Sequence, residues 1–388
     1  MTKRLFLRTA GFILALIFIV GAVSACSGAK NPVVLKVGNK EYRLSDFEKE
    51  YKGYRNYYTD YNMYDVSTEE KLKEFQDMVY DAILAREVLL YNAKLQGIEL
   101  TEEETKQAEE KAEAEMQNLL NSFIAQVDKR ITDEKQRETE ARANMAYSLA
   151  LQHTSYDKLY KETAQSYKDT ALREKLRKKV VEGFEATDED ALAFYEETLE
   201  ADRKRIEEDP GLYKSYMDFY EVSGGVQPLV VPEGYIRVKH ILVKDNTLIK
   251  IVETELAAGK DFDELLEQYG EDPEMKVEPA KTKGYLLGKA PSASDYFQEF
   301  KDAALALKEV GDISPKVVTE AGTHFIKLVE RIRAREIPYD EVKDEIFIAA
   351  LNKKKNDKFD SVLNEWMKAD YVAENRDLIR EVGKEEEK

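Results

Sequence analysis

Apolar residues in the first half of the chain recur at helical spacing. From Leu72 to Leu90 they follow the motif Ser67-Thr-Glu-Glu70, which is typical of a capping box, and Gly97 is placed to end that helix. Similar caps at Thr101–Glu104 and Thr187–Asp190 precede further amphipathic stretches, in which Pro and Gly are scarce. The pattern therefore predicts a series of long helices over nearly two hundred residues.

A short hairpin precedes these helices and a mixed unit follows them. Val33–Tyr42 alternates around the turn pair Gly38-Asn39, and the segment Ser223–Gly234 collects Gly and Pro, which marks a domain boundary. Beyond it the pattern predicts a strand at 235–243, helices at about 247–258, 261–269 and 295–307, and strands at 313–318 and 323–329. A final helical segment begins at Ile337 and carries the only tryptophan, Trp366. We expect an α+β fold that is mostly helical.

Two of the three histidines lie on apolar strand faces. His240 shares a face with the apolar residues of Tyr235–Val243, and His324 does the same in Thr323–Val329. Either one alone would be interpreted as a satisfied core residue. A zinc site would need a third ligand, and the remaining histidine, His153, belongs to the helical part, so no metal site is indicated. A serine hydrolase is not indicated either, because the sequence has no nucleophile-elbow motif.

The order of the motifs around these histidines resembles the parvulin family of peptidyl-prolyl cis-trans isomerases. The motifs are Val238–Val243, Ala257–Leu265, Tyr269–Pro273, Gly284–Gly288, Phe300–Leu307 and Gly322–Leu328. The resemblance covers roughly residues 233–333, and the flanking segments look like the chaperone portions of extracytoplasmic PrsA-like and SurA-like foldases. It implies a four-stranded sheet surrounded by helices, with the two histidines hydrogen-bonded at the floor of the site.

Carried over residue by residue, the resemblance implies a catalytic group and a proline pocket. The catalytic residues would be His240, Asp272 and His324, and the substrate-binding residues would be Leu287, Tyr296 and Phe300. Tyr296 stands where a methionine is usual, Ala321 stands where some members have a small hydroxyl residue, and Gly284–Gly288 replaces a Gly-Gly-Asp-Leu-Gly run. These departures bear on rate and substrate preference. The alternative for Asp272 is a plain turn residue before Pro273.

The implied activity is cis-trans isomerisation of Xaa-Pro peptide bonds, with no cofactor and no metal. We expect a signal peptide at 1–25, a tether at 26–34, a helical chaperone region at 35–227, a parvulin domain at 233–333, and a C-terminal helical segment at 334–388 that packs on the chaperone region. Two other functions stay open. One is a non-catalytic holdase with a degenerate parvulin domain, and the other is a lipid-tethered ligand-binding or structural lipoprotein.

The first 26 residues have the pattern of a bacterial lipoprotein signal. Lys3, Arg4 and Arg8 precede the apolar run Ala10–Val23, and Cys26, the only cysteine, follows small residues. This end resembles a lipobox, which implies that Cys26 is lipid-modified and becomes the new N-terminus. The alternative is an uncleaved membrane anchor. We expect an extracytoplasmic protein that is held at the cell membrane through lipidated Cys26.

The net charge and the aromatic residues of the chain indicate which classes of partner it can bind. The net charge of -18 argues against nucleic acid, because phosphate backbones are bound through clustered Lys and Arg. Unfolded or partly folded exported polypeptides are the partners implied by the resemblance, and a homodimer is left open.

One helical stripe carries Phe47, Tyr51, Tyr54, Tyr58 and Tyr61. It either packs against another helix or lines a cradle for unfolded chains.

Overall fold

The structure of the protein is a computed structural model that describes residues 31–60, 64–290 and 296–384. The chain divides into two compact units, one formed by residues 1–183 with 356–388 and the other by residues 184–355. Helix α12 (Tyr339–Trp366) contributes to both. The expected signal peptide, Cys26, the first part of the tether and Tyr61 lie outside the described residues. Within the described ranges, no helix is long and apolar enough to cross a membrane.

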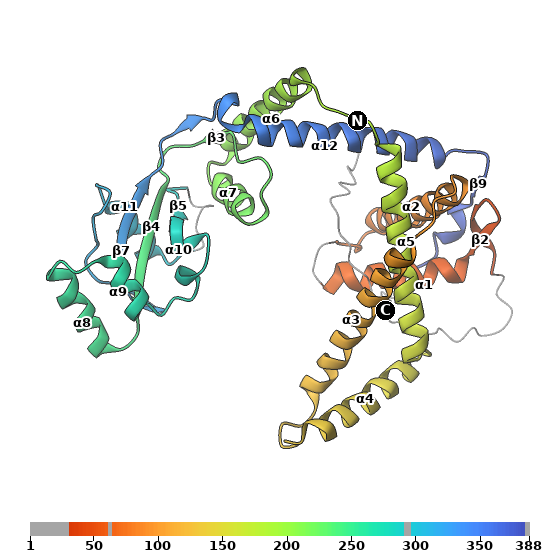
Figure 1. Cartoon of the computed structure of the whole chain (residues 1–388), viewed down its shortest axis with the longest axis horizontal. Coiled ribbons are helices and arrows are strands. Elements are labelled where there is room, and N and C mark those ends of the chain that lie inside the picture. The colour runs from red at the N-terminus through yellow and green to blue at the C-terminus, as the bar shows by residue number, and fades with distance from the viewer. Residues whose placement is uncertain (1–30, 61–63, 291–295, 385–388) are drawn as a thin grey trace. The chain divides into compact units, whose positions relative to one another are not determined.

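The first unit combines a small antiparallel sheet with long helices (Figure 1). The predicted hairpin is confirmed as β1 (Val33–Val37) and β2 (Lys40–Arg43), and β9 (Val372–Glu374) pairs with the other edge of β1. The helices are α1 (Leu44–Asp60), α2 (Glu69–Leu95), α3 (Glu102–Gln126), α4 (Glu134–Leu151) and α5 (Tyr156–Val180), and a short 3-10 turn covers Arg376–Ile379. Helix α3 packs against both α4 and α5, and α2 packs against α1 and α5.

The helix starts follow their capping chemistry. Thr101 and Glu104 form a reciprocal capping box, as predicted, and so do Thr187 and Asp190. For α2 the prediction was wrong in its register. Its N-cap is Thr68, whose hydroxyl accepts from the backbone N–H of Lys71, so the cap begins one residue later than the motif suggested. The end of α2 is confirmed, because Gly97 adopts a φ of +65° just beyond it.

The aromatic stripe of α1 packs largely inward. Phe47 and Tyr51 are buried in the core that α1 shares with α2, and the ring of Tyr51 meets Phe75 edge-on at 5.4 Å between centroids. Tyr54 and Tyr58 are partly buried against the same core and stack on each other. For the first two positions the structure therefore favours packing over a cradle.

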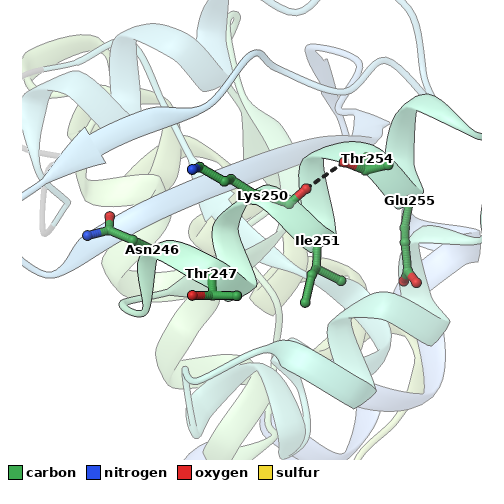
Figure 2. Close-up of a pocket in the computed structure, with 6 residues that line it drawn as sticks. All are labelled: Asn246, Thr247, Lys250, Ile251, Thr254 and Glu255. Carbon is green, nitrogen blue, oxygen red and sulfur yellow. Dashed lines mark hydrogen bonds between the residues drawn. The ribbon is translucent and has the colours of Figure 1, made fainter.

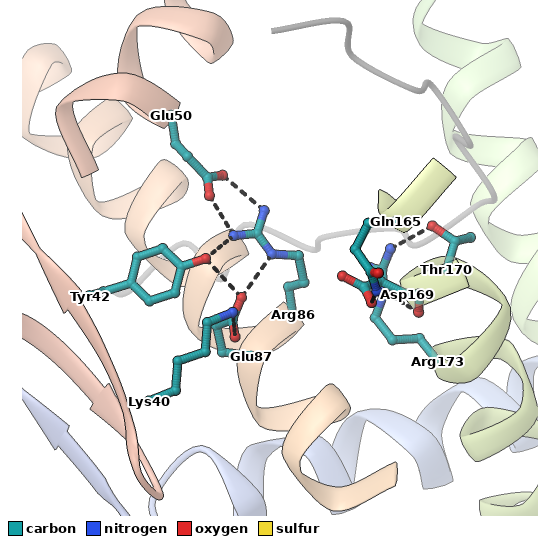
Figure 3. Close-up of polar contacts among 9 residues, drawn as sticks. All are labelled: Lys40, Tyr42, Glu50, Arg86, Glu87, Gln165, Asp169, Thr170 and Arg173. Atoms are coloured by element: carbon teal, nitrogen blue, oxygen red, sulfur yellow. Dashed lines mark hydrogen bonds and ion pairs between the residues drawn. The ribbon is translucent and has the colours of Figure 1, made fainter. Parts of the chain in front are cut away.

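A buried polar network ties α1, β2 and α2 together (Figure 3). Both terminal nitrogens of Arg86 bind the carboxylate of Glu50, at 2.9 and 2.5 Å, and one of them also donates to the Tyr42 hydroxyl at 2.8 Å. That hydroxyl donates to Glu87 at 2.9 Å, and Lys40 binds the other oxygen of Glu87 at 2.6 Å. Every buried charge in this network has an oppositely charged partner, as burial requires.

The second unit is built around a four-stranded antiparallel sheet in the order β5-β4-β7-β6 (Figure 1), which confirms the predicted fold class. Its strands are β4 (Ile236–Val243), β5 (Tyr285–Leu287), β6 (Val317–Thr319) and β7 (Gly322–Arg331), with a two-stranded ribbon of β3 (Val230–Val231) and β8 (Arg335–Glu336). Its helices are α6 (Asp188–Glu208), α7 (Leu212–Ser223), α8 (Asn246–Ala257), α9 (Phe262–Tyr269), α10 (Ala280–Lys283) and α11 (Gln298–Ala306), with a 3-10 turn at Glu274–Lys276.

The two faces of this sheet bury different helices. Ile241 and Val243 of β4 pack with Phe262 and other residues of α8 and α9. Val238 packs on the opposite face with Phe300 of α11. Alternate residues of β4 thus face alternate cores, which confirms the period-two pattern expected for this strand.

The strand expected at 313–318 is shorter than predicted. Only Val317–Thr319 forms β6, and Ile313 makes a single bridge to Lys327. Between them the side chain of Ser314 accepts from the backbone N–H of Ile326. A side chain that takes a ladder hydrogen bond interrupts the regular strand, because that N–H is no longer available to a backbone carbonyl.

Candidate active site

The two histidines meet on one face of the sheet. Antiparallel β4 and β7 place His240 opposite Ile326 and His324 opposite Leu242, so the histidines are diagonal neighbours on the same face. Their Nδ1 atoms lie 3.0 Å apart, and their relative exposures are only 3% and 4%. Each histidine on an apolar face therefore has the other as a polar partner, which accounts for the burial of both.

A chain of hydrogen bonds runs through this pair from Thr319 to Asp272. Nε2 of His240 lies 2.8 Å from Oδ2 of Asp272, and Nε2 of His324 lies 2.8 Å from Oγ1 of Thr319. An ionised carboxylate only accepts, so His240 donates from Nε2 and, in a neutral ring, accepts at Nδ1. His324 must then donate from Nδ1 and accept the Thr319 hydroxyl proton at Nε2. One carboxylate thus fixes the tautomers of both rings.

The electrostatics agree with a neutral ring at His324 and a charged carboxylate at Asp272. The hydrogen bond from His240 lowers the pKa of Asp272 to about 2 against the opposing effect of burial, with help from the backbone of Glu274 and the hydroxyl of Tyr285. Burial, and the proximity of His240, lower the pKa of His324 to about 4. At neutral pH the carboxylate of Asp272 is therefore negatively charged and the ring of His324 is neutral.

Asp272 is positioned by the turn that follows α9. At the end of α9 the backbone N–H of Gly270 donates to the carbonyl of Leu266. The next N–H, that of Glu271, donates to the carbonyl of Leu242 at 2.9 Å. The Glu271 carboxylate accepts from the N–H of Lys244, which fastens the turn to the end of β4 a second time. The other oxygen of Asp272 accepts from the N–H of Glu274 at 2.9 Å. These contacts place the carboxylate beside His240.

The residues expected to line a proline pocket lie next to the histidines, and two of the three are aromatic. Phe300 meets both imidazoles at steep angles, with its ring centroid 5.1 Å from that of His240 and 5.2 Å from that of His324. Tyr296 stacks on Phe300 at 5.7 Å and is partly buried. Leu287 is fully buried in the core beneath them. All six residues predicted for the site therefore lie in one neighbourhood, at the face covered by α11.

Two further residues join the site that the sequence did not single out. Thr319 supplies a hydroxyl that lies 2.8 Å from Nε2 of His324, whereas Ala321, which stands where some parvulins have a small hydroxyl residue, has none to offer. Thr319 lies two residues after Val317, which pairs with His324, so its side chain points to the same face. Tyr285 donates to Oδ2 of Asp272 at 2.9 Å. Period-two counting within the β6–β7 hairpin could have found Thr319, whereas the contact of Tyr285 depends on the path of the loop before it.

A cavity elsewhere in the second unit has no connection to these groups. It has a volume of about 490 Å³ and lies along α8, lined by Asn246, Thr247, Lys250, Ile251, Thr254 and Glu255 (Figure 2). None of the predicted site residues lines it. Among the residues that the structure describes, no cluster of His, Cys, Asp and Glu side chains is arranged to hold a metal ion.

Sequence comparison divides the chain into two matched regions. Residues 2–137 match a family described as the SurA-like N-terminal domain, and residues 243–330 match the PPIC-type PPIase domain. The second match includes Asp272, Leu287, Phe300 and His324, and it begins three residues after His240.

Similar proteins carry the name foldase PrsA. The chain is 38% identical over 146 residues to foldase protein PrsA 1 of Bacillus cereus, which covers 37% of this chain and 48% of that protein. It is 28% identical over 306 residues to foldase protein PrsA of Clostridium botulinum, covering 78% of this chain and 74% of that protein. The crystal structure of the peptidylprolyl isomerase PrsA from Bacillus cereus aligns with 93% of this chain and all of that chain at 20% identity, with a TM-score of 0.23. The chain therefore combines a region similar to the SurA-like N-terminal domain with a region similar to the PPIC-type peptidyl-prolyl isomerase domain, and the proteins similar to it include PrsA foldases.

Proposed function

We propose that this protein is an active foldase, which catalyses cis-trans isomerisation of Xaa-Pro bonds in exported polypeptides and shelters them in its helical region. The observation that carries the proposal is the hydrogen-bonded chain from Thr319 to Asp272 beside the ring of Phe300. It combines one fixed negative charge with an apolar surface, and both are useful to this reaction.

The chemistry requires no covalent step. Rotation about an Xaa-Pro bond is slow, because amide resonance is lost on the way, and it takes tens to hundreds of seconds without a catalyst. A thousandfold acceleration needs only about 4 kcal/mol of transition-state stabilisation. The aromatic wall of Phe300 and Tyr296 would hold the pyrrolidine ring while the chain on the other side turns. The carboxylate of Asp272 would disfavour negative charge on the substrate carbonyl, which weakens the resonance form that resists rotation.

Location at the membrane is part of the same proposal. The lipobox-like pattern around Cys26 supports removal of residues 1–25 and attachment of acyl chains to the cysteine. In a bacterial host, a Cys26→Ser variant should leave the membrane fraction, while the parent chain should remain there and incorporate labelled palmitate. Equal membrane retention of both forms would point to an uncleaved anchor instead.

The test of catalysis compares two aspartate variants. Asp272→Asn removes the charge at the site but keeps the size of the side chain. Asp263→Asn is the matched control, because Asp263 belongs to α9 and pairs with Lys239 and Lys327. We expect Asp272→Asn to lower kcat/KM on a short Xaa-Pro peptide by on the order of tenfold or more, and the control to match the parent.

The non-catalytic holdase is the second candidate, and the altered segment Gly284–Gly288 favours it. It predicts that the parent chain suppresses aggregation of an unfolded protein but shows no turnover on peptides and does not speed a proline-limited refolding reaction. That outcome would refute the catalytic proposal.

A further inference from the structure

Tyr285 is the second residue of Gly284–Gly288, the segment that departs from the parvulin pattern. It is the first residue of β5 and pairs with Val238 of β4, so its ring lies on the face that carries His240. The centroid of that ring is 5.4 Å from the imidazole of His240 and 5.4 Å from the ring of Tyr296. Tyr285 therefore extends the aromatic wall from Phe300 and Tyr296 toward the carboxylate.

The hydroxyl of Tyr285 is directed at acidic groups. Its oxygen is 2.9 Å from Oδ2 of Asp272 and 3.1 Å from Oε2 of Glu274. The same Oδ2 atom also accepts from Nε2 of His240. Two donors, one from each side, thus converge on one carboxylate oxygen, and this fixes the rotation of the side chain. Burial and the two carboxylates raise the pKa of Tyr285, so its hydroxyl keeps its proton at neutral pH.

The backbone before Tyr285 is held in place independently. Gly284 has a φ of +77°, and a Cβ atom there would lie 2.5 Å from the carbonyl oxygen of Val238. The guanidinium of Arg237 donates to the Gly284 carbonyl at 3.3 Å. Glu221 of α7 binds both Arg237, at 2.5 Å, and Lys283, at 3.1 Å. The residues that precede β5 are therefore anchored to β4 and to α7. These contacts hold the backbone of Tyr285 beside Asp272.

We infer that Tyr285 is a positioning residue of the isomerase site, whose hydroxyl holds the Asp272 carboxylate in line with His240 and whose ring completes the wall of the proline pocket. The inference rests on the proposed function, because it assigns a role within the same site. The inference also argues against the non-catalytic holdase. The residue that departs from the glycine of the family pattern supports the acidic group instead of blocking it.

The first test removes one hydroxyl. Tyr285→Phe keeps the ring, and Tyr269→Phe is the control, since the hydroxyl of Tyr269 accepts a hydrogen bond from Gln268 at the surface. We expect Tyr285→Phe to lower kcat/KM about five- to tenfold, as for an indirect loss of one hydrogen bond to a charged group, and the control to be unchanged. In the same variant the carboxyl carbon of Asp272, followed by NMR, should titrate at a higher pH than in the parent.

A double variant separates positioning from simple packing. If Tyr285 acts through Asp272, then Asp272→Asn with Tyr285→Phe should be no slower than Asp272→Asn alone, because the shared function is already lost. The inference would be overturned if the losses in kcat/KM of the two single variants multiplied in the double variant. It would also be overturned if the titration of Asp272 occurred at the same pH in Tyr285→Phe as in the parent. Failure of the proposed function has a different signature. The parent itself would show no turnover, while the NMR titration would still report whether Tyr285 holds the carboxylate.

Discussion

Replacement of Arg86 by alanine should destabilise the first unit selectively. The guanidinium is the cation that binds Glu50 through two hydrogen bonds and also contacts Tyr42 and Glu87. Its removal leaves the carboxylate of Glu50 without its cationic partner in the network, and Lys40 then remains as the cation that binds Glu87. The substitution therefore leaves the negative charge of Glu50 without a cation at a position that water reaches poorly.

The expected loss follows from the exposure of the groups. The side chains of Glu50 and Glu87 are 14% and 4% exposed, and that of Arg86 is 25% exposed. Breaking a fully buried ion pair costs about 3–5 kcal/mol, and partial access of water to Arg86 and Glu50 reduces this to about 2–3 kcal/mol. For a unit of this size, each kcal/mol shifts the midpoint of thermal unfolding by about 2–4 °C, so the transition should fall by about 4–12 °C.

Differential scanning calorimetry would measure this shift, since the two units can unfold in separate transitions. Arg142→Ala is the control. Arg142 pairs with Glu138 on the exposed surface of α4, and such pairs contribute only about 0.3–0.5 kcal/mol. The double variant Arg86→Met, Glu50→Met should lose less than Arg86→Ala, because no uncompensated charge remains at Glu50. If Arg86→Ala shifted the transition no more than the control does, the network would not stabilise the unit and the reasoning would be refuted.

Two further predictions concern the second unit. Because burial and His240 lower the pKa of His324 to about 4, below its ordinary value of 6.5, the unfolded chain takes up this proton first as the pH falls. Stability should therefore be complete above about pH 6.5 and decrease between pH 6.5 and 4, by at most on the order of 3 kcal/mol, and urea unfolding at several pH values should show a weaker slope in His324→Gln. An unchanged slope would contradict the shift. Gly284→Ala should cost more than Gly259→Ala in urea unfolding, although both glycines have positive φ, because only at Gly284 would the added Cβ collide with a backbone carbonyl. Equal losses would show that the loop relaxes around the methyl group.

Side-chain periodicity was sufficient to predict the part of the site that regular strands build. His240 and His324 were expected on apolar faces because each lies two residues from apolar residues of its own strand. The structure brings the two rings into contact. The long helices and two of the three caps were predictable for the same reason, since both depend on spacing within one element. Such features are local, and a single stretch of sequence contains all the information they need.

Short elements were not predictable in this way. Strand β9 has three residues and β5 has three, so neither offers enough alternation to be distinguished from a loop. Their positions depend on partners far along the chain, because Val372 pairs with Val37, and Tyr285 pairs with Val238. The register of the α2 cap was missed for a smaller reason. Ser67 and Thr68 are both good N-cap residues, and only the path of the preceding chain selects between them.

The same distinction explains why the support of Asp272 could not be derived from spacing. His240 approaches the carboxylate from a strand that the alternation fixes, whereas Tyr285 approaches it from a segment that turns at Gly284 and is anchored by Arg237 and Glu221. Arg237 of β4 is buried and binds Glu221 of α7, which also binds Lys283 of α10. This buried arginine also donates to the carbonyl of Gly284 and so anchors the segment that carries Tyr285. The arrangement of the acidic group therefore depends on contacts among β4, β5 and α7, which arise only once the second unit has folded.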